Sequence, residues 1–286
     1  MTFLGVGSAF AKRNYQSNAL VEAWSDSPAT QATPDANLLI DFGTTGPLAL
    51  WQLKDKKGFE YLGRGGEINY RSIQRIFITH THSDHVGGLE EMVQILTYHD
   101  STAEAMHRPE LLATQSILDR LWEHTLRGGL DVRHGRAALL TDYFEVNAVD
   151  LGTRLPAFNL LGRYDFFCFA TDHLRLASKH DWPSCGLLIQ DRHTHQSCYY
   201  SGDGCIDLNA VALIENASII FHEAVLQAAT HSVHTSLLQL RSLPEQVRKR
   251  MYLYHYDDAW DDPAFEYVSR EFAGFARPGQ RYTALA

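Results

Sequence analysis

The most informative part of the sequence is a short polar segment, Thr79-His80-Thr81-His82-Ser83-Asp84-His85, which directly follows the apolar run Ile76-Phe77-Ile78. Three imidazoles and a carboxylate within six residues are the ligand types that divalent metals such as zinc prefer. A tight loop at the end of a strand can aim several of these donors inward. We therefore interpret this segment as a metal-binding loop and not as a polar loop that faces solvent.

The residues on both sides of this loop predict how it is held. The apolar run before it is typical of a strand. After it, apolar side chains recur at helical spacing over residues 86–98, behind the pair Gly87-Gly88. A strand, a polar loop and a helix together form a common setting for catalytic groups.

Further short apolar runs, separated by polar turns, predict strands in both halves of the chain. The predicted strands cover residues 2–5, 37–41, 75–79, 166–170, 187–189, 197–200, 218–221 and 251–254, and the predicted helices cover residues 109–143, 236–243 and 245–250. This order favours an α/β fold in which two mixed sheets pack face to face with helices outside. We predict a single domain over residues 1–286 with a helical insertion at about 100–145.

The charge balance argues against one broad class of function. With 25 Lys and Arg against 34 Asp and Glu, the net charge of -9 gives no global positive field to hold a long polyanion. The amino terminus lacks the features of a secretory leader, and no stretch approaches the roughly 20 apolar residues of a membrane span. The cysteines lack the spacing of a disulfide framework or a zinc knuckle. We expect a soluble, cytoplasmic protein with no membrane partner and no extended nucleic-acid surface.

The pattern His80-x-His82-x-Asp84-His85 resembles the signature of the metallo-β-lactamase fold superfamily. That resemblance implies a four-layer αββα sandwich with a two-metal centre at one edge. The superfamily pattern also requires three later ligands, each after a strand, and this chain offers His173, Asp203 and His255 in that order. Carried over by position, one metal would be held by His80, His82 and His173, the other by Asp84, His85 and His255, with Asp203 as the bridge.

Such a centre has a defined chemistry. Two divalent cations about 3.5–4 Å apart lower the pKa of a bridging water and stabilise charge on both the attacking and the leaving oxygen. The resemblance therefore implies a dinuclear hydrolase that attacks with a metal-bridging hydroxide. Zinc suits the histidine-rich ligands, although the carboxylates also accept manganese or iron. The ligand set does not select the scissile bond, because the superfamily cleaves lactams, thioesters, lactones and phosphodiesters.

Other segments resemble the tRNase Z-like phosphodiesterases of this superfamily. They are the opening at residues 5–9, the pair Arg13-Asn14, residues 39–43, the His222-Glu223-Ala224 motif, in which Val225 replaces a Thr, and residues 233–236. The resemblance implies that Arg13 and Asn14 bind substrate. An imidazole oriented by a carboxylate is a suitable general acid for an alkoxide leaving group. We therefore assign Glu223 and His234 as catalytic residues, together with Asp84.

One departure from the tRNase Z pattern points to a small substrate. In tRNase Z, an arm that grips tRNA is inserted between the lone His and the bridging Asp, but here only 30 residues separate His173 from Asp203. A loop, two strands and a turn already occupy that interval. We therefore favour a phosphodiesterase that acts on a cyclic nucleotide or a short oligonucleotide, similar to phage enzymes that degrade cyclic-nucleotide signals.

Three alternatives stay open from the sequence. They are a tRNA 3′-processing endoribonuclease of the tRNase Z type, a thioesterase or lactonase of the glyoxalase II type, and a metal-binding scaffold without activity. Related enzymes are commonly homodimers, so we expect a homodimer here. Residues 121–130, which include Leu121-Trp122 and Leu126, offer a candidate contact surface or lid.

Overall fold

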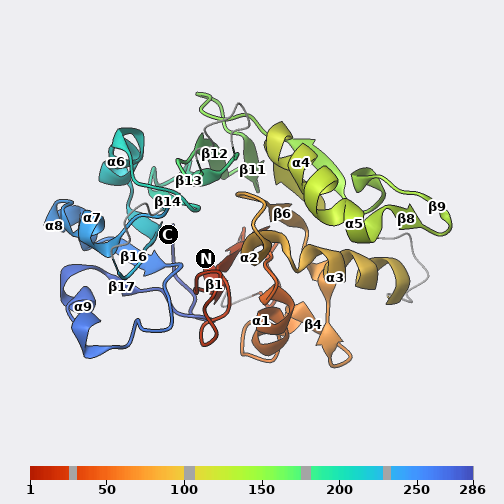
Figure 1. Ribbon diagram of the computed structural model, residues 1–286, viewed down its shortest axis with the longest axis horizontal. Helices are drawn as coiled ribbons and strands as arrows, with labels where there is room; N and C mark the ends of the chain where they lie inside the picture. Colours follow the sequence, from red (N-terminus) through yellow and green to blue (C-terminus); the bar gives the residue numbers. More distant parts are fainter. Residues whose placement is uncertain (26–30, 100–106, 175–181, 228–232, 286) are drawn as a thin grey trace.

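The structure is a computed structural model that describes residues 1–25, 31–99, 107–174, 182–227 and 233–285, and two β-sheets dominate it (Figure 1). The first sheet contains, in spatial order, β1 (Thr2–Gly5), β2 (Asn18–Ala23), β3 (Ala36–Ile40), β6 (Arg75–Phe77), β7 (Glu110–Ala113) and β10 (Glu145–Ala148). The second contains β11 (Phe158–Leu160), β12 (Tyr164–Ala170), β13 (Cys185–Asp191), β14 (Ser197–Tyr200), β15 (Ile219–Glu223), β16 (Met251–Tyr254) and β17 (Gly274–Phe275).

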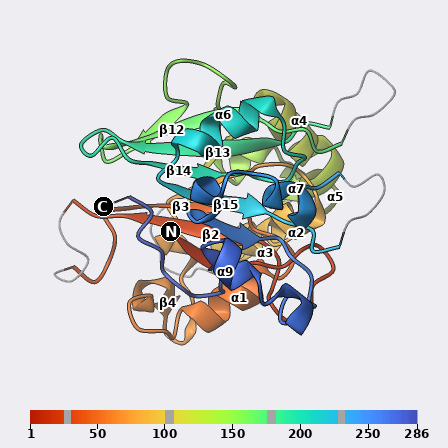
Figure 2. The same cartoon turned by 90° about the vertical axis from the view of Figure 1, so that its left-hand side faces the viewer.

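Helices cover the outer side of each sheet (Figure 1). The first sheet carries α1 (Gly46–Leu53), α3 (Leu89–Gln94), α4 (Gln115–Leu121) and α5 (Arg127–Leu130), with π-helical turns at Ile95–His99 and Trp122–Leu126. Figure 2 shows α6 (Leu208–Asn216), α7 (Leu237–Arg241) and α9 (Val268–Glu271) lying over the second sheet, and α8 (Glu245–Arg248) follows α7. These layers confirm the predicted αββα sandwich.

Smaller elements complete the chain. They are α2 (Ser83–Val86), the hairpins β4 (Gly63–Arg64) with β5 (Glu67–Ile68) and β8 (Val132–Arg133) with β9 (Arg136–Ala137), and 3-10 turns at Glu60–Leu62, Tyr70–Ser72, Leu140–Asp142 and Pro263–Phe265. Within the described ranges, no helix is both long and apolar enough to cross a bilayer.

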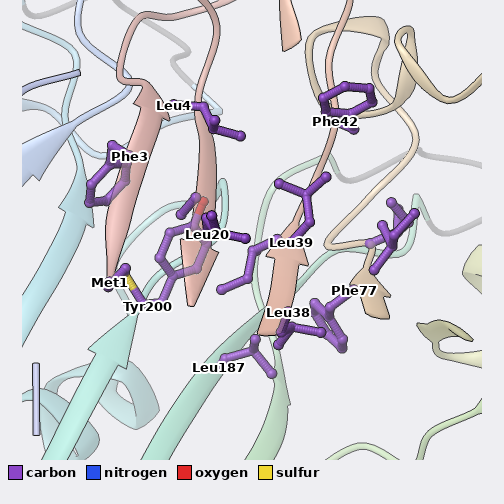
Figure 3. Packing of buried hydrophobic residues seen from close by; sticks show 14 of the residues in the cluster. Met1, Phe3, Leu4, Leu20, Leu38, Leu39, Phe42, Phe77, Leu187 and Tyr200 are labelled. Carbon is purple, nitrogen blue, oxygen red and sulfur yellow. The ribbon is translucent and has the colours of Figure 1, made fainter. Parts of the chain in front are cut away.

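The core lies between the two sheets and is rich in aromatic rings. Phe3 of β1 is fully buried, and its ring centroid lies 5.2 Å from that of Phe221 and 5.4 Å from that of Tyr254, both in the second sheet. Figure 3 shows Phe3 beside Tyr200 of β14. Every residue of β3 is buried, as expected for a strand covered on both faces. Apolar burial between the sheets therefore holds the two halves of the chain together.

The predicted strands all form, but the helical prediction for residues 109–143 is wrong at its start and at its end. After α5 ends at Leu130, the chain forms the β8–β9 hairpin and a 3-10 turn in place of helix, because Gly135 favours a tight turn. Glu110–Ala113 is strand β7, which pairs in parallel with β6 and β10. A short apolar run such as Leu111-Leu112 does not distinguish a buried strand from a helix by periodicity, and here the pairing partners decide. Four apolar residues between 121 and 130 also face inward and offer no contact surface: Leu121, Trp122, Leu126 and Leu130.

The sheet topology brings several strand ends to one edge. β12 and β14 both run antiparallel to β13, so they share a direction, and β15 and β16 lie parallel to β14. The carboxyl ends of β12, β14, β15 and β16 therefore meet at the same edge of the second sheet. The loop after β6 joins them from the first sheet, since Cys185 donates its N–H to the carbonyl of Thr79 at 3.0 Å.

The inter-sheet core predicts where the fold is most sensitive. Because Phe3 packs against rings of the other sheet, Phe3→Ala should lower the free energy of unfolding by about 3–5 kcal/mol. Phe10→Ala is the matched control, since Phe10 is 87% exposed and its loss should cost less than about 0.5 kcal/mol. Urea denaturation of the metal-free protein measures both values. Equal losses for the two variants would contradict this account of the core.

Candidate metal centre

Four strand ends and one short helix supply the side chains that the sequence predicted as metal ligands. The loop after β6 carries His80 and His82, and α2 carries Asp84 and His85. The segments after β12, β14 and β16 carry the other three, His173, Asp203 and His255. The structure brings all seven together in two adjoining groups. Six of the seven are buried, and His82 is partly exposed.

The first group consists of three imidazoles whose nitrogens converge. His82 Nδ1 lies 3.0 Å from His80 Nε2 and 3.1 Å from His173 Nε2. The opposite nitrogen of each flanking ring has its own partner: His80 Nδ1 lies 3.0 Å from Thr79 Oγ1, and His173 Nδ1 lies 3.2 Å from the carbonyl of Val233. Protons on those outer nitrogens leave both Nε2 lone pairs directed at His82 Nδ1, which can donate to only one of them. A cation between the three nitrogens satisfies all of these lone pairs.

The second group surrounds the Asp203 carboxylate. His255 Nε2 lies 3.1 Å from Asp203 Oδ2 and 3.3 Å from Asp84 Oδ2, while His85 Nε2 lies 3.3 Å from each of those two oxygens. His80 Nε2 of the first group is 3.9 Å from Asp203 Oδ2, so this carboxylate lies between the groups. Among the described residues, His85 Nε2 and Asp203 Oδ1 are buried without a hydrogen-bond partner. Orphaned buried atoms of these types fit a pair of divalent cations.

The charge states suit metal binding. Burial lowers the pKa of His80, His82 and His173, to about 4 for His82, so these rings stay neutral and keep their lone pairs. Burial acts in the opposite direction on Asp84 and Asp203, but neighbouring imidazoles outweigh it and hold the pKa of both carboxyls well below the usual range. The three imidazoles of the first group and the two carboxylates are therefore in their ligating forms. Burial acts to lower the pKa of His85, but the carboxylates of Asp203, Asp84 and Asp41 outweigh it and raise that pKa, so a metal ion would have to displace a proton from this ring.

Asp41 orients the second group, a role that the sequence analysis did not assign. Its carboxylate accepts a hydrogen bond from His85 Nδ1 at 2.7 Å, and also from the backbone N–H and the hydroxyl of Thr79 at 2.8 and 2.7 Å. The first contact fixes which nitrogen of His85 faces the metal position. Asp41 (φ 61°) and His255 (φ 59°) both adopt left-handed backbone, which is characteristic of strained functional positions. The sequence signals for Asp41 were its place at the end of a predicted strand and within residues 39–43, which resemble the tRNase Z-like enzymes, but neither signal gave it a role.

A glycine is required beside Asp203. Gly202 has a φ of 60°, and a Cβ at this position would lie 2.3 Å from the carbonyl oxygen of Cys185. Any side chain would therefore push the Asp203 turn away from β13. This close approach explains why the residue directly before Asp203 is a glycine.

The two residues predicted to act as a general acid pair do lie together. His234 Nδ1 is 3.0 Å from Glu223 Oε2, and the His234 ring is 4.9 Å from the rings of both His173 and His255. Glu223 is fully buried at the end of β15. Burial acts to lower the pKa of His234, but the Glu223 carboxylate outweighs it and raises the pKa to about 9.

The predicted substrate residues have different surroundings. Arg13 forms a bidentate ion pair with Asp261 at 2.9 and 2.5 Å and donates to the carbonyl of Asp258 at 3.0 Å. Its guanidinium thus ties the loop at residues 8–14 to the segment that follows His255. Asn14 is buried, and its Nδ2 has no hydrogen-bond partner within the described residues. The substrate role of both residues stays a prediction.

Solved structures share this fold along nearly the whole chain. A metallo-β-lactamase fold protein, YhfI from Bacillus subtilis, superposes with a TM-score of 0.66 at 14% identity, covering 98% of this chain and 96% of that one. The short form of human tRNase Z gives a TM-score of 0.63 at 18% identity, covering 100% and 99%. Unliganded yeast PDE1 gives 0.64 at 14% identity, covering 96% and 93%. The fold and the site together define a metal-dependent hydrolase of the metallo-β-lactamase fold.

Sequence comparison is more specific than the fold. The family described as Anti-Pycsar protein Apyc1 matches residues 1–282, and this chain belongs to it. The Apyc1 protein of Paenibacillus harenae is 32% identical over 260 residues, which is 90% of each chain. That of Bacillus phage BSP38 is 31% identical over 262 residues, covering 91% of this chain and 89% of the relative.

The converging donors predict metal content. The unaltered protein, expressed with supplemented metal, should hold about two transition-metal ions per chain, and Asp203→Asn should hold fewer because the charge between the two groups is gone. Exposed His124 provides the control, since His124→Asn should leave the content unchanged. Elemental analysis of the purified proteins measures this. Trace metal in the unaltered protein, or full content in Asp203→Asn, would overturn the assignment.

Proposed function

We propose that this enzyme is a dinuclear phosphodiesterase that hydrolyses small phosphodiesters, with cyclic nucleotides as the preferred class. The Glu223–His234 pair beside the seven candidate ligands carries this proposal, because acyl hydrolysis has no requirement for such a pair. The resemblance to phage enzymes that degrade cyclic-nucleotide signals, and the phage relatives in this family, support the same substrate class.

The chain's own residues suit phosphodiester cleavage. When bound, two divalent ions would activate water and neutralise phosphate charge. His80, His82 and His173 would hold one ion, Asp84, His85 and His255 the other, and Asp203 would bridge them. Glu223 accepts from His234 Nδ1, so the proton for the departing alkoxide would come from Nε2 of the same ring.

Hydrogen bonds connect the Glu223–His234 pair to the turn that carries the bridging Asp203. Glu223 Oε1 accepts hydrogen bonds from the backbone N–H of Gly204 at 3.0 Å and of Thr235 at 3.1 Å. Thr235 Oγ1 in turn donates to the carbonyl of Gly204 at 2.9 Å. Gly204 follows the bridging Asp203, and Thr235 follows the acid His234. One carboxylate therefore sets the spacing between the proton donor and the metal bridge.

The short interval between His173 and Asp203 supports a small substrate. Strands β13 and β14, which pair with each other, take up about half of the described part of that interval. This leaves little chain for an arm that grips tRNA, so we rank the tRNA 3′-processing alternative second. A thioesterase or lactonase shares the ligand set and ranks third.

We also propose that the native metal is zinc and that the enzyme is a homodimer. The nitrogen-rich first group supports zinc. Leu48 and Trp51, 54% and 39% exposed on α1, provide apolar surface for a subunit contact in place of the buried residues at 121–130. Sedimentation velocity measures the oligomer directly.

Removal of the proposed acid should act selectively. His234→Ala should lower kcat by roughly 10²–10⁴ for a nucleoside alkoxide leaving group, while a p-nitrophenyl ester, which expels a stable anion, should change little. Metal content should stay unchanged. Glu223→Gln should give a milder form of the same pattern. Equal losses for good and poor leaving groups would exclude the general-acid role and leave the metal centre intact.

Substrate size gives a separate test. The kcat/KM values for 3′,5′-cyclic nucleotides, dinucleotides and a precursor tRNA should fall in that order, because the 30-residue step from His173 to Asp203 is short for an arm that grips the body of a tRNA. A thioester and a lactone, assayed alongside, should be poor substrates. A preference for precursor tRNA of about tenfold or more would reverse the ranking.

A further inference from the structure

A tryptophan outside the ligand set lies against one of the candidate ligands. The ring of Trp182 is 4.8 Å from the ring of His82, at an angle of 34°. Trp182 also forms an antiparallel bridge with Leu174, the residue after His173. The indole therefore contacts one member of the first group and is anchored beside another.

The Trp182 ring also contacts an arginine from helix α4. The guanidinium carbon of Arg120 lies 3.7 Å from the centre of the Trp182 ring. Within the described ranges, this guanidinium has no ion pair or hydrogen bond, and its Nε is buried. Arg127, farther along the same helical segment, is instead paired with Glu123 at 2.5 Å. The stacking on the indole is thus the main interaction of the Arg120 guanidinium in the described structure. A cation above an aromatic ring is attracted to the face of that ring.

His82 differs from its two neighbours in how its ring is oriented. The outer nitrogens of His80 and His173 each have a partner, Thr79 Oγ1 and the carbonyl of Val233. His82 turns Nδ1 toward the other imidazoles, and its Nε2 has no hydrogen-bond partner among the residues that the structure describes. It is also the one partly exposed member of the group. Ring contact with Trp182 takes the place that a hydrogen bond has for the other two.

We propose that Trp182 and Arg120 are positioning residues that fix the His82 ring for metal binding. This inference rests on the metal centre of the proposed function and gives α4 a role in the site. Arg120 holds the indole, and the indole holds the imidazole in the orientation that directs Nδ1 at the ion. Loss of an outer partner of a metal-binding histidine typically costs about 10–100-fold in metal affinity.

The experiment measures zinc affinity by competition with a chromogenic chelator. In Trp182→Ala, one of the two ions should bind about 10–100-fold more weakly, and the other should change by less than about threefold. Trp182→Phe keeps an aromatic face and should restore most of the affinity. Arg120→Met should weaken the same ion, Arg120→Lys should weaken it less, and Arg127→Met is the control.

A double variant tests whether Arg120 acts through the indole. If it does, Arg120→Met should add almost nothing once Trp182→Ala is present, so the two effects should not sum. Thermal unfolding of each metal-free variant monitors folding. Should Trp182→Ala fail to fold, the comparison of Arg120→Met with Arg120→Lys and Arg127→Met decides the question, because these changes leave the core intact.

Several results would overturn the inference. They are unchanged affinity for both ions in Trp182→Ala, equal weakening of both ions, and a raised KM for the phosphodiester with unaltered metal affinity, which would make Trp182 a substrate contact. The affinity readout needs no hydrolysis. Failure of the proposed function would instead appear as absent phosphodiesterase activity in the unaltered, metal-loaded protein.

Discussion

The burial of two carboxylates, Asp84 and Asp203, at one sheet edge is the constraint on which the site depends. An isolated buried carboxylate is very costly, so positive charge must reach it. His85 and His255 lie within 3.3 Å of both carboxylates, but the three imidazoles of the first group are neutral and bring only lone pairs. The carboxylates raise the pKa of His85, so its protonated ring supplies part of the positive charge, and cations between the neutral nitrogens and the anionic oxygens would supply the rest. Metal binding and the local stability of this edge are therefore linked.

The order of strands explains why one edge can collect so many ligands. Strands that run in the same direction bring residues far apart in sequence to the same edge of the sheet. Each strand end then needs only one polar residue to supply a ligand. Packing between the sheets then fixes the loop after β6 against the second sheet. The aromatic core around Phe3 reaches the Asp203 turn through Tyr254, which packs against Phe3 and donates its hydroxyl to the carbonyl of Gly202 at 3.1 Å.

The sequence predicted the metal ligands better than it predicted the residues that orient them. The segment from His80 to His85 was recognisable because four donors stand in six residues, and each later ligand follows a predicted strand. Asp41 lies in a segment that resembles the tRNase Z-like enzymes, but it was not assigned a role because its contacts with Thr79 and His85 join residues distant in sequence. Trp182 was not assigned either, because a ring contact between two loops produces no periodic pattern in the sequence. β7 was predicted as helix because its burial comes from strands far away in the chain.

The position of Glu223 connects the chemistry to the fold. A glutamine at this site would keep one carbonyl oxygen for the N–H groups of Gly204 and Thr235, so the turn geometry would survive. The other position would become an NH₂ group, which donates, and His234 Nδ1 would have to accept. That reverses the tautomer and removes the negative charge that raises the pKa of His234. A carboxylate meets both demands at once, because each oxygen accepts: one sets the spacing of the two turns, and the other keeps a proton on the imidazole.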